Sequence, residues 1–265
     1  MKKRILELLV IGVAVFRYSS MASGVDESLG SFLRLHGVPR YDYQVITVYP
    51  HDHSAFTQGL VLVDGVLYES TGLYGESSLR KVNLETGEIF EKIDLGEAYF
   101  AEGITVWEDT IVQLTWESKV AFIYEKGTLR RLGSSPYPYA GWGITSDGEN
   151  LIAGDGSEVL RFLDPVDFTV KKEIVVRVGE RTIDRLNELE YADGRIYANV
   201  WHEDLIVVID PRGGELLGWI DLAELLDPGK GGENVLNGIA FDYQTRTFLI
   251  TGKRWHSVYR LKVEE

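Results

Sequence analysis

A short phrase that recurs five times constrains the fold of this chain more than any other feature. Phe-Thr-Gln-Gly-Leu at residues 56–60 is echoed by Phe-Ala-Glu-Gly-Ile at 100–104 and by Gly-Trp-Gly-Ile at 141–144. Two weaker echoes follow at 186–190 and 236–240, the first with leucine in place of glycine. Successive phrases lie about 40 to 50 residues apart, which is the length of one four-stranded blade of a β-propeller.

Each phrase leads into the same local pattern, a short aliphatic strand, a turn and a second strand. Asp64-Gly65, Asp147-Gly148 and Asp193-Gly194 are hairpin signals, because Asp and Gly tolerate the positive φ at which strands reverse. The segments after the turns are rich in β-branched and aromatic residues, and a helical period is absent from them. An all-β fold is therefore predicted. Short helices are expected only at residues 28–35, 181–189 and 221–226.

The two ends of the chain carry complementary pieces of the repeat. The last repeat stops one strand short, and an orphan strand at residues 43–48 precedes the first phrase. Pairing this strand with the last repeat would leave no long sheet edge unpaired. We therefore predict a five-bladed β-propeller over residues 40–265, with its ring closed by the N-terminal strand that completes the last blade.

Composition excludes several classes of function. The chain has no cysteine, which rules out disulfides, thiolate nucleophiles and Cys-ligated zinc. Its formal charge of -14, with no visible cluster of Lys and Arg, argues against a nucleic-acid partner. The chain also lacks a Walker-type phosphate loop and a Gly-x-Ser-x-Gly elbow.

The N-terminus has the pattern of an export signal. Met-Lys-Lys-Arg precedes an apolar run at residues 5–16, and small residues follow at 21–24. Residues 1–24 are therefore predicted to be a signal peptide or short anchor, and the protein to be periplasmic, secreted or membrane-anchored. The alternative is an amphipathic helix packed on the protein, which Glu7 and Arg17 favour. No other stretch approaches the roughly 18 apolar residues of a membrane span.

The repeated phrase is also the first place to look for a site, because equivalent positions of all blades converge at one mouth of the central channel. The residues there are polar or aromatic where repetition alone asks for small or apolar ones. They are Gln58, Glu102, Trp142, Asn187 with Glu188, and Asn237. A second ring of candidates at the ends of the following strands is Glu69, Trp116, Asp155, Trp201 and Lys253. The alternative for the tryptophans is packing between blades.

Glu102 is the sharpest single candidate. Next to Phe100 and facing Trp116 and Trp142, its carboxyl would be desolvated and its pKa raised, which suits a group that moves a proton near neutral pH. The alternative is a structural carboxylate that accepts backbone N–H groups at a blade end. The segment His51-Asp52-His53 is interpreted as a solvated loop rather than a metal cluster, because on a strand Asp52 would face away from both histidines.

Several long phrases, in order along the chain, resemble the plant and bacterial glutamine cyclotransferases. Beyond the repeated phrases, they include Tyr-Glu-Ser-Thr-Gly-Leu-Tyr-Gly at 68–75, Gln-Leu-Thr-Trp at 113–116, Asn-Val-Trp at 199–201 and Thr-Gly-Lys at 251–253. The resemblance runs from about Tyr43 to Val263 and covers all five repeats. In His51-Asp52-His53 the second histidine stands where a proline is expected in relatives, a departure that concerns the loop and not the site.

This resemblance implies a five-bladed propeller enzyme, an acyltransferase that converts the N-terminal glutamine of peptides into pyroglutamate and releases ammonia. It implies Glu102 as the proton shuttle. The pocket residues that it implies are Phe56, Gln58, Phe100, Trp116, Trp142, Asn187, Trp201, Asn237 and Lys253, to which the second ring adds Glu69.

The partner expected is a peptide or protein with N-terminal glutamine, bound by a monomer without cofactor or metal. Two other functions stay open from the residues. One is a metal-dependent, lactonase-like hydrolase with Glu102, Asn187 and Asn237 around Ca²⁺. The other is a propeller that binds peptides through its tryptophan-lined mouth without turning them over.

Overall fold

The computed structural model describes residues 28–264, which form one helix and twenty-two strands. Three four-stranded antiparallel sheets follow one another along the chain, each with its strands in sequence order. The first is β2 (Thr57–Val63), β3 (Val66–Thr71), β4 (Ser78–Val82) and β5 (Ile89–Asp94). The second is β6 (Ala101–Trp107), β7 (Thr110–Thr115), β8 (Val120–Glu125) and β9 (Arg131–Pro136). The third is β10 (Ile144–Ser146), β11 (Leu151–Gly154), β12 (Val159–Leu163) and β13 (Val170–Val175).

The remaining long strands form one eight-stranded sheet in the order β16-β17-β18-β19-β1-β22-β21-β20. Its first half is β16 (Leu186–Ala192), β17 (Arg195–Val200), β18 (Leu205–Ile209) and β19 (Leu216–Asp221). Its second half is β1 (Arg40–Pro50), β22 (Ser257–Glu264), β21 (Thr247–Gly252) and β20 (Leu236–Asp242). A small hairpin, β14 (Arg177–Val178) and β15 (Arg181–Thr182), stands apart from the sheets.

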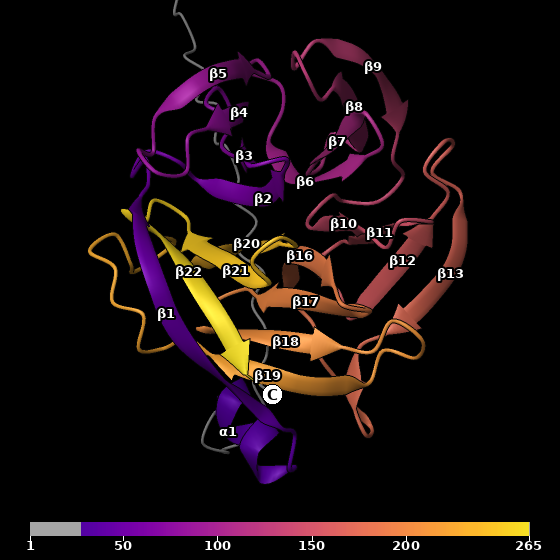
Figure 1. The fold of residues 1–265 in the computed structure, drawn as a ribbon. Coiled ribbons are helices and arrows are strands. Elements are labelled where there is room, and N and C mark those ends of the chain that lie inside the picture. Colours follow the sequence, from indigo (N-terminus) through magenta and orange to yellow (C-terminus); the bar gives the residue numbers. More distant parts are fainter. Residues whose placement is uncertain (1–27, 265) are drawn as a thin grey trace, which may run out of the picture.

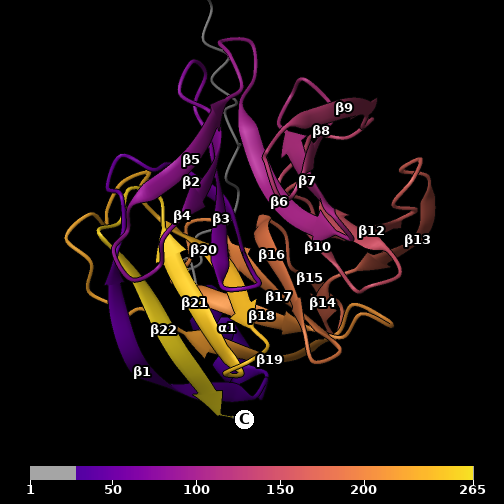
Figure 2. The same ribbon diagram turned by 45° about the horizontal axis from the view of Figure 1, so that its top comes forward.

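The N-terminal strand joins the two ends of the chain. β1 pairs antiparallel with β22 from Asp42 opposite Glu264 to Pro50 opposite Ser257. Its contact with β19 is limited to two parallel pairs at Arg40 and Tyr41. Figure 2 shows β1 and β22 at the outside of the molecule and β20 nearer its centre. The orphan strand that the sequence places before the first repeat therefore lies beside the last strand of the chain.

The sheets are arranged around a common centre, as in a β-propeller (Figure 1). The innermost strands are β2, β6, β10, β16 and β20. β2 contacts β6, β6 contacts β10, β10 contacts β16, β16 contacts β20, and β20 contacts β2. The repeated phrases lie on or next to these five strands, so all five phrases lie at the centre, two of them on the eight-stranded sheet.

The glycines of the repeated phrase have a packing reason. A Cβ on Gly59 would lie 2.5 Å from the backbone nitrogen of Ile104, and one on Gly103 would lie 2.7 Å from the carbonyl oxygen of Trp142. A Cβ on Gly143 would collide with the carbonyl oxygen of Asn187. Backbone meets backbone at these points, so only glycine lets neighbouring inner strands come so close.

The helix α1 (Leu29–Leu35) confirms the helix expected at 28–35. Ser28 caps it, since its side chain accepts a hydrogen bond from the N–H of Ser31. Leu29, Phe32 and Leu33 are buried in the core that also holds Trp219. Each of these side chains contributes about 2 kcal/mol by leaving water, so the helix is part of the core and not merely attached to it.

The other two expected helices are wrong. Residues 181–189 contain β15 and the first half of β16, and residues 222–226 are turn and irregular chain after the end of β19. The apolar residues whose spacing suggested a helix pack against the sheet instead, and Ile183 and Leu186 are buried in the core beside β17 and β18. Within residues 28–264, no helix is long and apolar enough to cross a membrane. The predicted signal segment, 1–24, lies outside the described residues.

Candidate active site

One end of the inner strands opens into a pocket of about 240 Å³. Nine of the residues proposed from the sequence line it, together with one residue that the sequence did not suggest. The lining is Phe56, Gln58, Phe100, Glu102, Trp116, Trp142, Asn187, Trp201, Glu233 and Lys253. Three of them, Gln58, Glu102 and Asn187, lie on inner strands, Glu233 lies in the loop between β19 and β20, and the others lie just before or after strands of the four sheets.

The local backbone explains why the repeated phrase points into this pocket. The pairing register of β2 shifts between Thr57 and Gly59, and that of β6 shifts between Ala101 and Ile104. β16 and β20 shift at the equivalent places. Such irregularities re-aim side chains and are common beside active sites. Gln58, Glu102 and Asn187 each lie within one of them.

The walls of the pocket are aromatic. Phe100 makes edge-to-face contacts with Phe56, with ring centroids 6.3 Å apart, and with Trp116 at 5.7 Å. Across from them, Trp142 and Trp201 meet edge-to-face at 5.8 Å. These three indoles line the cavity, whereas Trp219 and Trp255 are fully buried in the cores of the sheets. The three candidate tryptophans therefore line a cavity, and Trp219 and Trp255, which were not candidates, are the ones that fill the core.

Glu102 is the only carboxyl of the lining that is buried, with 5% of its surface exposed. Burial raises the pKa of Glu102 well above its ordinary value, and the charge of Lys253 only partly opposes this. Within residues 28–264 the carboxyl group has no hydrogen-bond donor of its own. It is therefore a carboxyl that faces the cavity and holds its proton more tightly than usual.

Lys253 is the basic counterpart of Glu102. Its side chain is also 5% exposed, and Nζ lies 4.9 Å from the centre of the Phe56 ring. Burial lowers the pKa of Lys253, while the charges of Glu102 and Glu233 raise it by less. An acid and a base, each shifted toward its neutral form, thus share one small apolar cavity.

Asn237 sets the orientation of Gln58 from behind the wall. Its Nδ2 donates to the carbonyl oxygen of Thr57 at 3.0 Å and to Oε1 of Gln58 at 3.1 Å. The oxygen of the Gln58 amide is therefore occupied, and its NH₂ group is the part left for the pocket. Asn237 itself is fully buried and does not line the cavity.

Asn187 presents a hydrogen-bond acceptor to the pocket, whereas Gln58 presents a donor. Its Oδ1 is buried without a donor among the described residues, although the side chain lines the cavity. A buried amide oxygen without a partner costs about 1 to 3 kcal/mol, so a bound N–H group would remove that cost. The floor of the pocket thus offers a donor at Gln58 and an acceptor at Asn187.

Glu69 does not line the pocket, contrary to the prediction of a substrate contact. Its side chain is 1% exposed and lies behind the wall, where Oε1 is 2.8 Å from Nε2 of His51 and accepts a hydrogen bond from Thr57. Arg80 approaches its other oxygen at 3.8 Å. Two basic partners, His51 and Arg80, and the hydroxyl of Thr57 compensate its charge there, which makes full burial possible.

The interpretation of residues 51–53 as a solvated loop is wrong for His51. This ring is buried, with Nδ1 2.8 Å from the carbonyl oxygen of Trp255 and Nε2 on Glu69. Asp52 accepts hydrogen bonds from Ser54 and Arg80. Among residues 28–264, no group of three or more histidine or acidic side chains is placed to hold a metal ion.

Glu233 is the lining residue that sequence reasoning missed. It lies outside the repeated phrase, in the glycine-rich loop between β19 and β20, where no periodic signal marks it. The glycines at 229, 231 and 232 are a local sign that the backbone makes a tight turn there.

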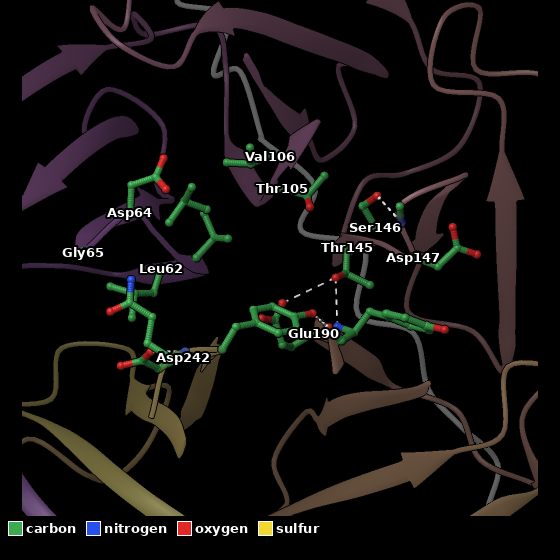
Figure 3. Close-up of a pocket in the computed structure, with 16 residues that line it drawn as sticks. Leu62, Asp64, Gly65, Thr105, Val106, Thr145, Ser146, Asp147, Glu190 and Asp242 are labelled. Carbon is green, nitrogen blue, oxygen red and sulfur yellow. Dashed lines mark hydrogen bonds between the residues drawn. The ribbon is translucent and has the colours of Figure 1, made fainter. Parts of the chain in front are cut away.

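A second cavity, of about 500 Å³, lies at the other end of the same inner strands (Figure 3). The more deeply packed of its two buried carboxyls, Glu190, accepts hydrogen bonds from the N–H of Phe241 and from Thr145. Burial raises the pKa of Glu190 to about 8. Between the two cavities, Glu188 accepts the N–H groups of Leu60 and Ile239 from two neighbouring strands. The structural role considered for Glu102 is thus played by Glu188 and Glu190.

Comparison with known proteins places this site in context. The sequence matches the glutamine cyclotransferase family over residues 13–263. It is 39% identical over 271 residues to the glutaminyl-peptide cyclotransferase of Arabidopsis thaliana, an alignment that covers 98% of this chain and 83% of that protein. The fold is similar to the crystal structure of Myxococcus xanthus glutaminyl cyclase, with a TM-score of 0.78 and 32% identity. That similarity covers 85% of this chain and 98% of the other.

Proposed function

Because the chain belongs to the glutamine cyclotransferase family, we propose that its aromatic pocket binds an N-terminal glutamine and that Glu102 moves the proton of the reaction. The protein is a glutaminyl-peptide cyclotransferase, which converts that glutamine to pyroglutamate and releases ammonia. The observation that carries the mechanism is the buried Glu102 carboxyl, which faces the cavity without a donor among residues 28–264 and has a raised pKa. Neither other function considered from the sequence gains support from the family.

The reaction is a transfer within one residue. The α-amine nitrogen attacks the side-chain amide carbon, the new C–N bond closes a five-membered ring, and the bond from that carbon to the amide nitrogen breaks. One proton leaves the α-nitrogen and one must reach the departing nitrogen, which leaves as ammonia. Ionised Glu102 accepts the first proton and, now neutral, donates it to the leaving group. A raised pKa suits it to both steps near neutral pH.

The aromatic walls position the substrate and take no part in proton transfer. A cavity of about 240 Å³ is smaller than the roughly 300 Å³ at the low end of drug-sized ligand sites. It suits one side chain folded back toward its own amine. Holding that conformer shortens the distance of attack, and this can account for several kcal/mol of the barrier. Trp142 and Trp201 on one side and Phe100 and Trp116 on the other are the surfaces that hold it.

Two donors are available to the oxygen that gains charge when the amine attacks. They are Nε2 of Gln58, oriented by Asn237, and Nζ of Lys253. A well-placed donor of this kind contributes about 3 kcal/mol to the transition state. Asn237 is not one of them, because its NH₂ group already has two acceptors. Oδ1 of Asn187 would accept an N–H of the substrate.

We also infer that the strands form five blades of a closed propeller over residues 40–265. The contacts that pass from β2 through β6, β10, β16 and β20 back to β2 support this, as does the pairing of β1 with β22. For residues 1–24 we propose a signal or anchor that directs export, and for the folded part a monomer. Mass spectrometry of the mature N-terminus and light scattering test these two points.

Glu102→Gln is the decisive test of the function. With a peptide that begins with glutamine, the wild-type protein should release ammonia and shorten the peptide mass by one ammonia. The variant should lose a factor of about 10² to 10⁴ in kcat while keeping its circular dichroism spectrum and melting temperature. Glu149→Gln, an exposed change of the same kind at the other end of β10, should leave kcat unchanged. An unmodified peptide with the wild-type protein would overturn the proposal.

A further inference from the structure

We infer that Glu233 makes this protein favour substrates in which lysine or arginine follows the N-terminal glutamine. The inference rests on the function proposed above, because the second residue of the substrate lies at the rim only if glutamine fills the pocket. Glu233 is at that rim. It lines the cavity, yet its side chain is 70% exposed.

The loop that carries Glu233 has a defined shape. Gly231 and Asn234 exchange two backbone hydrogen bonds, of 3.2 and 3.0 Å, which close a tight turn with Glu233 at its tip. Nδ2 of Asn234 donates to the carbonyl oxygen of Gly229 at 3.0 Å. The indole N–H of Trp255, a core residue, donates to the carbonyl oxygen of Asn234 at 3.1 Å. The turn is therefore tied to the sheet that carries Lys253, and the carboxylate is presented from a fixed base.

The charge of Glu233 acts on the pocket. Its negative charge partly opposes the lowering of the Lys253 pKa by burial, so the carboxylate lies close enough to interact with that buried amine. Its nearest basic side chain is His202, whose Nε2 lies 4.0 Å from a carboxylate oxygen. The ring of His202 packs on that of Trp201, at 4.3 Å between centroids. A carboxylate and a tryptophan of the pocket wall thus flank the same side of the rim.

A carboxylate beside an aromatic ring is a setting that recognises ammonium and guanidinium groups. Within residues 28–264, Glu233 has no ion pair with lysine or arginine, so its charge is free for a ligand. Lys230 on the same loop is paired with Asp204 at 2.9 Å. Arg254, an exposed cation, has its backbone packed against this loop at Gly229, but its guanidinium lies over the Phe56 ring, 5.6 Å from the ring centre.

The test compares three peptides that differ only in the residue after glutamine: arginine, alanine or glutamate. With the wild-type protein at low salt, kcat/KM should fall in that order, with about two- to fivefold between arginine and alanine. The difference should lie in KM and shrink as salt is added. In Glu233→Gln the ratio between the arginine and glutamate peptides should drop to near one.

Using the ratio between peptides removes any effect that Glu233→Gln has on Lys253, because that effect is common to all three. Glu149→Gln serves as the charge-matched control and should keep the wild-type ratio. Equal kcat/KM for the three peptides, or a preference for glutamate governed by Arg254, would refute the inference while leaving the cyclotransferase intact. If none of the peptides is converted, both the proposed function and this inference fail.

Discussion

At the scale of single residues, three glutamates near the axis show how environment divides one residue type into different roles. Glu188 and Glu190 accept backbone N–H groups of neighbouring inner strands, so they hold the sheets together. Glu102 has no such donor in the described part of the chain and faces the cavity instead. All three have raised pKa values because all are buried. A shifted pKa alone would not have separated the catalytic candidate from the structural ones; hydrogen-bond partners did.

The first prediction at this scale concerns Asn237, a positioning residue for Gln58. Asn237→Ala should lower kcat about tenfold or more with little change in KM, because the Gln58 amide would lose the bond that turns its NH₂ toward the substrate. In a Gln58→Ala background the same change should cost much less, since the group it positions is gone. Steady-state kinetics of the four proteins measures this coupling. Additive losses in the double variant would contradict it.

At the scale of elements, the pocket depends on a buried ion pair that joins two segments distant in sequence. Both ring nitrogens of His51 face acceptors, the carbonyl oxygen of Trp255 and the carboxylate of Glu69, which favours the doubly protonated ring. The backbone N–H of His51 also donates to the carbonyl oxygen of His256, and the backbone N–H of Arg254 donates to the carbonyl oxygen of Ala55. The segment that leads to Gln58 is thereby clamped to the segment that carries Lys253.

The pH dependence of this clamp follows from its two partners. Burial lowers the pKa of His51, but the charge and hydrogen bond of Glu69 outweigh burial and hold it above its usual 6.5. Burial raises the pKa of Glu69, but His51 and Arg80 bring it below its usual 4.5. The contribution of His51 to the free energy of unfolding is complete below the pKa that His51 has in the unfolded chain, and it is lost as pH rises through the pKa of the folded state. That of Glu69 is complete above its unfolded pKa and is lost as pH falls through the folded value.

The second prediction is therefore that Glu69→Gln destabilises the protein by about 3 to 5 kcal/mol between pH 5 and 6.5, where the pair is fully charged. The loss should shrink above the folded pKa of His51, where the wild-type pair has itself lost its proton. Urea unfolding at several pH values measures this. Asp42→Asn, an exposed partner of Arg40, is the control and should change stability by less than about 1 kcal/mol. A loss from Glu69→Gln that does not shrink as the pH rises above the folded pKa of His51 would rule out the charged pair.

At the scale of the whole molecule, the close approach of the inner strands decides how the sheets fit together. The third prediction is that Gly59→Ala destabilises by about 3 kcal/mol or more, because the new methyl group would meet the backbone of Ile104 and Gly103, which cannot move aside cheaply. Gly133→Ala in β9 is the matched control, since nothing lies within 4 Å of a Cβ there. Thermal melts of both variants decide the point. Equal melting temperatures would show that the inner strands can separate.

The sequence by itself determined the local features, because they depend on residues close together in the chain. The repeat, its hairpin turns and its glycines are local signals, and they located the strands and most of the pocket lining. The N-terminal strand was also predictable, since the last repeat lacks one. The apolar spacing at 181–189 misled, because sheet packing from elsewhere in the chain overrides a local helical pattern.

Only the tertiary structure decided which of the candidate side chains face the cavity. Glu69 meets His51, and Asn237 meets Gln58, only after strands far apart in sequence are brought together, so no spacing could show that both stand behind the wall. Glu233 reaches the rim because Trp255 holds its loop, a contact without any periodic trace in the sequence. Burial, hydrogen bonding and pKa depend on residues that come together only in the folded chain. For that reason the chemistry of the site could be determined only from the tertiary structure.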